Sequence, residues 1–180
     1  MFLLRYQERP SQNIEDTLKQ GIDFMESYKS PLKAEEPEWG IDGLVISPLR
    51  PDDVVLGATP SNTHGRWSMN LAQGWNASSI NRTVPENYYF VITGVRKGAG
   101  SCVTEVQFAV AGKELLVVNI EEIDTWEERL CYFRKPFGVP PEKALTTHLR
   151  AHTANTTDFF GILGYKIVVA DNGKQQQVSV

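Results

Sequence analysis

Cysteine is scarce in this sequence, which has only Cys102 and Cys131 among its 180 residues. Two cysteines do not make the disulfide framework of small secreted domains, so we expect two buried free thiols. Long apolar runs are also missing. No stretch approaches eighteen apolar residues, and the apolar start, Met1–Leu4, is far shorter than the core of a signal peptide. The sequence therefore predicts neither a membrane span nor a signal peptide.

An excess of positive charge is absent as well. Lys and Arg number 18 and Asp and Glu number 22, so the net charge is −4 at neutral pH. The basic residues are spread along the chain, and nothing predicts a nucleic acid partner. The 41% hydrophobic and 22% charged residues are typical of a globular protein with one good-sized core.

The common motifs of nucleotide-binding proteins, hydrolases and metalloproteases are missing. The sequence contains no G-x-S-x-G, no P-loop, no G-x-G-x-x-G, no H-E-x-x-H and no C-x-x-C. We therefore predict a protein without enzymatic activity and without a cofactor.

Two weaker arrangements keep an enzyme open as an alternative. His148 and His152 lie four residues apart and would share one face of a strand, where His64 could complete a three-histidine metal site. The H-x-H pair and downstream Glu of cupin-type enzymes are missing, and surface histidines explain the pattern more simply. Glu105 and Glu114 could be paired carboxylates of a glycosidase, but solvent-facing positions on a sheet explain them without catalysis.

What the sequence does contain is a central stretch of two strand-like runs, from Pro85 to Val110. Residues 88–95 are nearly all aromatic or β-branched and apolar on both faces, which is typical of a strand in the middle of a sheet. Residues 102–110 alternate, which is typical of a strand with one wet face. A glycine-containing turn, 96–101, joins the two runs, and we expect them to pair.

Further strand-like runs lie on either side of this stretch. We expect strands at 43–47, 53–57, 66–72, 114–120, 130–134, 144–150 and 159–170. In 144–150, Leu145, Thr147 and Leu149 should point inward. We expect connections at 59–65, at the long polar stretch 74–85 and at the proline-rich crossing 135–141.

The predicted loop 74–85 carries a tryptophan, Trp75, with two interpretations. It could close one end of the sandwich as a core plug, or it could stack on a sugar ring. We therefore name Trp75 and Asn76 as candidates for outward-facing recognition.

The N-terminal part contains one amphipathic helix after an arm without periodicity, residues 1–10, which we expect to be extended. Its apolar stripe consists of Ile14, Leu18, Ile22 and Met25. Gly21 should weaken the middle of the helix by about 1 kcal/mol relative to alanine, and Pro31 should end it. The stripe could pack on the chain's own β-core or on a neighbouring subunit.

These patterns predict a mainly β protein, an antiparallel β-sandwich preceded by an extended arm and one amphipathic helix. About eight to ten strands with glycine- and proline-containing turns favour a jelly roll. We expect an arm and helix in residues 1–40, a β-sandwich domain in 41–172 and a loose tail in 173–180.

Four segments resemble the small jelly-roll-like proteins that decorate or assemble bacteriophage particles. They are VPENYYFVITGV (84–95), CVTEVQFAVAG (102–112), LCYFRKPFGVPPEKALTTHL (130–149) and FFGILGYKIVV (159–169). The likeness lies in the rhythm of strands and turns. It implies a non-enzymatic structural protein of the virion, either a capsid decoration (cement) protein or a tail-associated one, often a trimer.

In that role the chain would be a homo-oligomer, with a trimer favoured, that contacts neighbouring capsid or tail proteins and neither nucleic acid nor membrane. It would reside in the virion after assembly in the host cytoplasm, or otherwise in the cytoplasm. The predicted assembly interface consists of Phe2, Leu3, Leu4, Ile14, Leu18, Ile22 and Met25. The alternatives are a carbohydrate- or receptor-binding β-sandwich module and, third, a metal-dependent jelly-roll enzyme.

Overall fold

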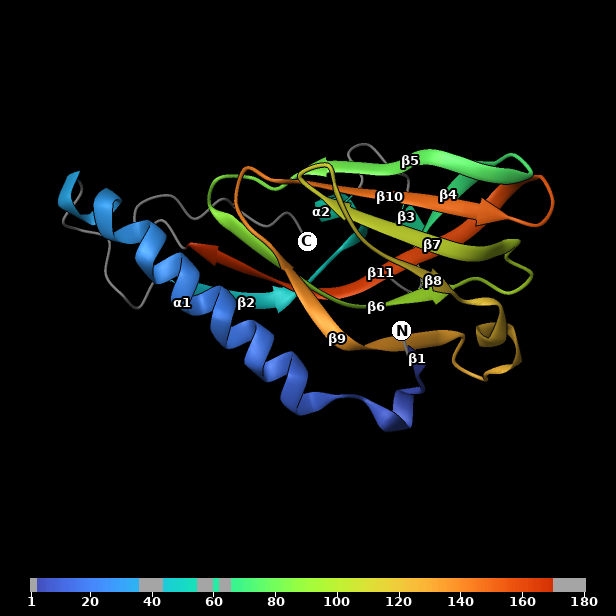
Figure 1. Cartoon of the computed structure of the whole chain (residues 1–180), viewed down its shortest axis with the longest axis horizontal. Coiled ribbons are helices and arrows are strands. Elements are labelled where there is room, and N and C mark those ends of the chain that lie inside the picture. Colours follow the sequence, from blue (N-terminus) through green and yellow to red (C-terminus); the bar gives the residue numbers. More distant parts are fainter. Residues whose placement is uncertain (1–2, 36–43, 55–59, 62–65, 170–180) are drawn as a thin grey trace.

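The computed structural model describes residues 3–35, 44–54, 60–61 and 66–169, which form two antiparallel sheets and a long helix (Figure 1). The larger sheet has the strand order β1-β9-β6-β11-β4-β3, and β2 pairs with the C-terminal part of β11. The smaller sheet has the order β5-β10-β7-β8. The prediction of a mainly β, antiparallel sandwich with one amphipathic helix is confirmed.

The strands and helices have the following bounds. The strands are β1 (Leu3–Leu4), β2 (Leu44–Pro48), β3 (Pro60–Ser61), β4 (Arg66–Leu71), β5 (Gly74–Thr83), β6 (Tyr88–Lys97), β7 (Val103–Val110), β8 (Lys113–Asn119), β9 (Leu130–Val139), β10 (Ala144–Ala151) and β11 (Asn155–Val169). The helices are α1 (Ser11–Glu35), α2 (Pro51–Val54) and the 3₁₀ turns η1 (Tyr6–Glu8) and η3 (Glu121–Thr125).

The connectivity is that of a jelly roll. Strand β4 pairs with β11, β5 with β10, β6 with β9 and β7 with β8, so the pairs are nested along the chain. Nested pairing of eight strands results when one long hairpin is wound into two facing sheets. The predicted arrangement is therefore the observed one.

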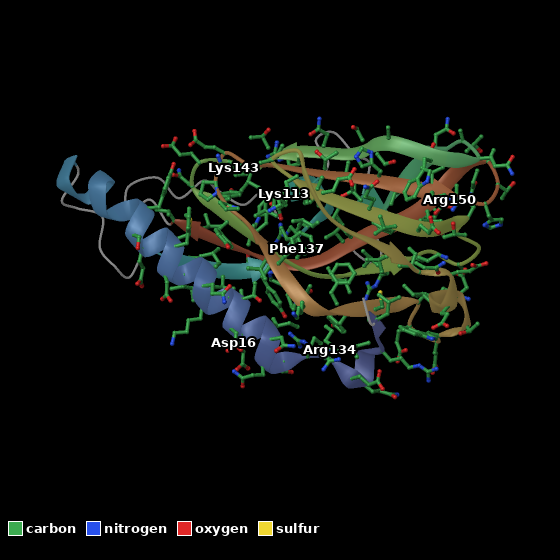
Figure 2. All side chains as sticks on the ribbon, in the orientation of Figure 1. Asp16, Lys113, Arg134, Phe137, Lys143 and Arg150 are labelled. Atoms are coloured by element: carbon green, nitrogen blue, oxygen red, sulfur yellow. The ribbon has the colours of Figure 1, made fainter. Side chains whose placement is uncertain are left out.

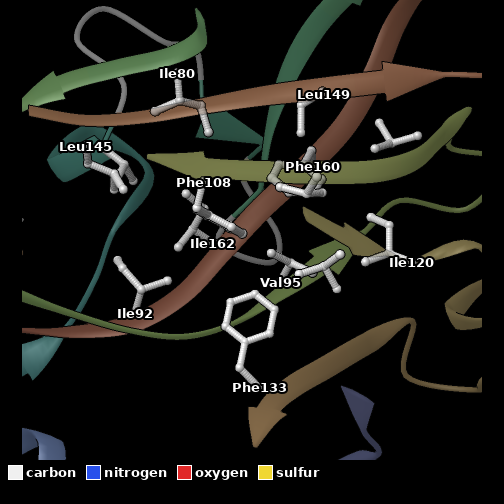
Figure 3. Packing of buried hydrophobic residues seen from close by; sticks show 14 of the residues in the cluster. Ile80, Ile92, Val95, Phe108, Ile120, Phe133, Leu145, Leu149, Phe160 and Ile162 are labelled. Carbon is white, nitrogen blue, oxygen red and sulfur yellow. The ribbon is translucent and has the colours of Figure 1, made fainter. Parts of the chain in front are cut away.

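Side chains from both sheets meet between them and form the main core (Figure 3). Phe108 of β7 packs edge-on against Phe133 of β9, with 5.5 Å between the ring centroids. The inward residues of β10 were predicted correctly, because Leu145, Thr147 and Leu149 are fully buried.

The outer side of the larger sheet is covered by α1, which crosses β9, β6 and β11 (Figure 1). A second apolar cluster lies beneath the helix, where Met25 packs with Tyr89, Val91 and Ile167. Strand β6 thus has one face in the main core and the other under α1. This explains its apolar residues on both faces, and its predicted place in the middle of a sheet is confirmed.

The predicted pairing of the two central runs is wrong. Strand β6 lies in the larger sheet and β7 in the smaller one, so the chain crosses from one sheet to the other between them. Strand β6 pairs instead with β9 and β11, and β7 pairs with β8 and β10.

Two predicted connections are strands. The polar stretch 74–83 forms β5, because its backbone pairs along β10 even though Ile80 is its only fully buried side chain. Residues 135–139 continue β9 instead of crossing to another element. This part of β9 contains a bulge, in which residues 133–136 lie opposite a single residue of β6, Thr93. Pro136 fits there because a residue in a bulge need not donate a backbone hydrogen bond to the neighbouring strand.

Two helix predictions are corrected as well. Residues 51–54 form α2 instead of the start of a strand, with Pro51 at its first position, where proline is tolerated; residues 55–57 lie outside the described ranges. Helix α1 continues through Pro31 to Glu35 instead of ending there. A proline at this position removes one backbone hydrogen bond near the helix end.

The N-terminal arm is attached to the larger sheet. Leu3–Leu4 forms β1, which pairs antiparallel with β9. The guanidinium carbons of Arg5 and Arg9 lie 5.4 Å and 5.8 Å from the ring centroids of Trp126 and Tyr132. The arm is therefore extended only in part, and it is held by strand pairing and cation–π contacts.

Gly21 lies where α1 packs tightly against β6 and β11. A Cβ on Gly21 would lie 2.7 Å from Cδ1 of Ile167 and 2.9 Å from ring atoms of Tyr89. At an exposed helix position glycine costs about 1 kcal/mol relative to alanine. Here the missing side chain lets the helix pack.

We therefore expect Gly21→Ala to destabilise the protein by about 1–3 kcal/mol, the cost of overpacking a core. Urea unfolding at neutral pH measures this change. Gln20→Ala, at the exposed position next to it, should stay within about 0.5 kcal/mol of the unsubstituted protein. A gain in stability for Gly21→Ala would contradict the close packing of α1.

None of the helices within the described ranges is long and apolar enough to cross a membrane.

Candidate functional site

The outer face of the smaller sheet carries a set of polar side chains in register. Because Leu145, Thr147 and Leu149 point into the core, the alternate residues of β10 point outward. We call this outer surface the open face; it includes His148 and Arg150. Figure 2 shows Arg150 on the outer side of the molecule near one end of β10.

One row of the open face crosses all four strands. Trp75 of β5 is opposite Arg150 of β10, Arg150 is opposite Glu105 of β7, and Glu105 is opposite Asn119 of β8. Directly opposed residues of antiparallel strands lie on the same face. Arg150 Nη1 donates to Glu105 Oε2 at 3.1 Å. Such an exposed pair adds at most about 1 kcal/mol of stability, but it directs the guanidinium towards β7 within the same row as Trp75.

The adjacent row contains His148, which is opposite Gln107 of β7. The backbone N–H of Ser78 donates to His148 Nδ1 at 2.8 Å. Nδ1 of His148 is therefore used as an acceptor within the chain, by the neighbouring strand β5.

Trp75 is exposed by 47%, so it is not the core plug that we considered. The side chain of Asn76, in contrast, forms hydrogen bonds within the chain. Its Nδ2 donates to the carbonyl oxygens of Ala72 and Gly74 at 2.9 Å and 3.1 Å, and its Oδ1 accepts from Ala72 N–H at 2.9 Å. Asn76 therefore shapes the turn before Trp75, and of the two predicted recognition residues only Trp75 presents its side chain outward.

Two of the three histidines that we considered as a metal site lie within the described residues. His148 lies on the open face, whereas Nδ1 of His152 lies 2.9 Å from the carbonyl oxygen of Cys102. His64 lies outside the described residues. Across 3–35, 44–54, 60–61 and 66–169, no group of three or more His, Cys, Asp or Glu could hold a metal ion.

Glu105 and Glu114 do not lie opposite each other. Glu114 is opposite Ala109, four residues along β7 from Glu105. At about 3.3 Å per residue this separates their backbones by roughly 13 Å along the strands. Glu105 instead accepts a hydrogen bond from Arg150 of the neighbouring strand, so the register does not place the two glutamates side by side as a pair.

Asp158 is a buried carboxylate with a structural role. Its side chain accepts from Ser101 Oγ at 2.6 Å, from Cys102 N–H at 2.7 Å and from Asn155 Nδ2 at 3.3 Å. Ser101 and Cys102 belong to the segment that crosses from β6 to β7. The carboxylate therefore fastens this crossing to β11.

A second carboxylate, that of Asp53, binds β11 further along the strand. In α2, Asp53 Oδ1 accepts from Lys166 Nζ of β11 at 2.7 Å, and the Asp53 carbonyl accepts from Arg82 Nε of β5 at 3.1 Å. One short helix thus links both sheets. Both Asp53 and Asp158 therefore join elements of the fold.

The two cysteines are free and buried, as predicted. Burial raises the pKa of the Cys131 thiol to about 12. The pKa of the Cys102 thiol is also raised to about 12. Burial is the largest cause, and the hydrogen bond with Asp158 is the next. Both thiols therefore remain protonated at neutral pH and are poor nucleophiles.

These pKa shifts predict a loss of stability at alkaline pH. The unfolded chain releases the thiol protons near pH 9, whereas the folded chain keeps them to about pH 12. The free energy of unfolding should therefore fall as the pH rises from 9 towards 12, by up to about 1.4 kcal/mol per pH unit for each thiol. Urea unfolding at pH 8 and at pH 10.5 measures the slope.

The double variant Cys102→Ala/Cys131→Ala provides the control. It should lose most of this slope and keep a remainder from Tyr89, whose pKa is raised by burial. If the free energy of unfolding falls equally with pH in both proteins, the thiols are not the cause of the fall.

The predicted assembly residues fall into three groups. Ile14 and Met25 are buried by the chain's own sheet, so the prediction that they form a subunit interface is corrected for these two. Leu18 and Ile22 are partly buried against the same cluster, and Leu3 and Leu4 are partly buried in β1. Phe2 lies outside the described residues. The alternative that the stripe packs on its own β-core agrees with this placement.

Sequence reasoning singled out Trp75 but missed its row partner Arg150 as a site residue, and considered Glu105 only as a catalytic acid. The alternation in 144–150 placed Arg150 on the wet face, yet only the strand register shows that it lies between Trp75 and Glu105.

No protein family and no curated protein matches this chain. A search of solved structures finds a similarity to the mosquito-larvicidal Cry4Aa toxin from Bacillus thuringiensis, with 10% sequence identity and a TM-score of 0.30. The match covers 70% of this chain and 24% of the toxin chain. A similarity at this level carries no argument about function.

Proposed function

We propose that the protein is a non-enzymatic structural subunit of a phage or virus particle, a capsid decoration or tail-associated protein held by contacts between subunits. The observation that supports this proposal is a pair of edge strands with exposed aliphatic side chains. Val45 and Ile46 of β2 are exposed by 51% and 45%, and Leu115 and Val117 of β8 by 41% and 51%.

Edge strands with exposed β-branched residues are sites where another chain can add a strand, and proteins that remain monomeric blunt them with charge or bulges. In the described part of the chain, β2 has β11 as its one ladder partner and β8 has β7. A strand of a neighbouring subunit could therefore pair with the second edge of each strand.

The two edges belong to different sheets, which bears on the symmetry of the assembly. A contact between β2 of one copy and β8 of the next is head-to-tail, and contacts of this kind close into rings when the rotation permits. The trimer remains our expected state. The edge strands take the place of Ile14 and Met25 in the proposed interface.

The test is the mass of the purified chain in solution, measured by light scattering after size exclusion. We expect an oligomer for the unsubstituted chain and monomers for Val45→Lys and Val117→Lys, because a lysine blunts each edge. Gln20→Lys, on the solvent side of α1, is the matched control and should leave the oligomer intact. A monomeric unsubstituted chain, or an oligomer that tolerates both edge lysines, would contradict the proposal.

A further inference from the structure

We infer that the open face binds a neutral saccharide, with a sugar ring stacked on Trp75 and its hydroxyl groups hydrogen-bonded to Arg150 and Glu105. This is a second surface, separate from the edge contacts proposed above.

Trp75 provides the apolar part of the site. Trp75 is exposed by nearly half at the start of β5, although tryptophan is highly buried on average and contributes large contact areas where it binds. The turn that Asn76 holds with three hydrogen bonds fixes the backbone beside it. The indole is therefore a preorganised platform for the C–H face of a sugar ring.

Arg150 and Glu105 provide the polar part. A guanidinium offers up to five N–H donors and a carboxylate only acceptors, whereas a sugar hydroxyl both donates and accepts. Their mutual bond at 3.1 Å holds the two groups in one row with Trp75, and half of the Arg150 side chain remains exposed. With strands about 4.8 Å apart, this row extends roughly 14 Å across four strands, which is enough for more than one sugar ring.

The charge of the row selects among ligand classes. One cation and one anion balance each other, so the row gives no electrostatic preference for polyanions such as nucleic acids. A second protein copy is also a poor fit, since interface cores are depleted of charged residues and a dry contact would have to desolvate the Arg150–Glu105 pair. A neutral polyhydroxylated ligand can keep both groups hydrogen-bonded.

The experiment titrates the full-length chain with a panel of neutral hexasaccharides of different linkage, at concentrations up to millimolar, and follows binding by calorimetry. We expect at least one to bind. Trp75→Ala should weaken that binding by about tenfold or more, because a stacking contact worth about 1.4 kcal/mol corresponds to a factor of ten. Arg150→Gln should weaken it by a smaller factor, since the amide keeps some hydrogen bonds.

Gln20→Ala, which shortens an exposed side chain of α1 outside both proposed surfaces, is the control and should leave the affinity unchanged. Thermal unfolding verifies that each variant is folded. The inference is overturned if no hexasaccharide binds, or if Trp75→Ala binds as tightly as the unsubstituted chain. It is also overturned if Trp75→Ala abolishes self-association, because a second copy would then cover this face. The edge variants Val45→Lys and Val117→Lys test assembly separately, so the two proposals can fail independently.

Discussion

Replacing Asp158 with alanine is expected to lower the free energy of unfolding by about 3–5 kcal/mol. Asp158 is 1% exposed and accepts hydrogen bonds from Ser101 Oγ and Cys102 N–H, both of which are buried. Removal of the carboxylate leaves these donors without an acceptor, at about 1–3 kcal/mol each. It also frees the crossing between β6 and β7 from β11. Urea or thermal unfolding followed by circular dichroism measures the loss.

Two further variants separate the role of the carboxylate from the effect of substitution in general. Asp158→Asn keeps the shape and one acceptor oxygen, so its loss should lie between zero and that of the alanine variant. Asp16→Ala removes an exposed aspartate of α1 whose Oδ1 accepts from Gln12 Nε2 at 2.9 Å, and it should change stability by no more than about 0.5 kcal/mol. If Asp158→Ala is as stable as Asp16→Ala, the carboxylate does not fasten the crossing.

The hydrogen bonds of Asp158 also explain why the central pairing could not be predicted. The two runs of 85–110 have the composition of adjacent strands, and a six-residue connection fits a hairpin as well as a crossing. In the structure the connection is a crossing, and it is bound by a carboxylate of β11 more than fifty positions further along the chain. Local patterns carry no information about such a contact.

A strand could be predicted from the sequence where both of its faces are apolar, and could not be predicted where most of its side chains are polar. Strand β6 is apolar on both faces, because one face lies in the main core and the other lies under α1. Its sequence therefore predicts a central strand. Strand β5 reads as a loop because it lies at the edge of the smaller sheet and buries only Ile80 fully. Its conformation is set by backbone pairing with β10, which depends little on side-chain polarity.

The candidate site was predictable only in part for the same reason. A tryptophan in a polar stretch is visible in the sequence, and so is the outward direction of Arg150 in an alternating strand. Their proximity depends on the register between β5 and β10, which includes a bulge between Thr147 and Leu149. A shift of one residue would have placed Arg150 on the other face from Trp75.

Gly94→Ala is expected to have an effect at least as large as that of Asp158→Ala, because it acts on the backbone of two adjacent strands. A Cβ on Gly94 would lie 2.0 Å from the carbonyl oxygen of Cys131 and 3.1 Å from Cα of Tyr132, both in β9. No side-chain rotation relieves a contact between backbone atoms, so β6 and β9 would have to separate next to the β9 bulge. We expect a loss of about 4 kcal/mol or more.

Gly100→Ala is the control that separates this steric effect from the general cost of replacing glycine. Gly100 has a positive φ of 69°, and apart from its chain neighbours no atom lies within 4 Å of the position that a Cβ would occupy. Its replacement should cost only the strain of the left-handed backbone, about 1–2 kcal/mol. Since Gly94→Ala is expected to fold poorly, the yield of folded protein and its thermal midpoint are measured for both variants side by side. Equal midpoints would contradict the close approach of β6 and β9, whereas a much lower midpoint for Gly94→Ala would show that the close pairing of these two strands depends on the missing side chain.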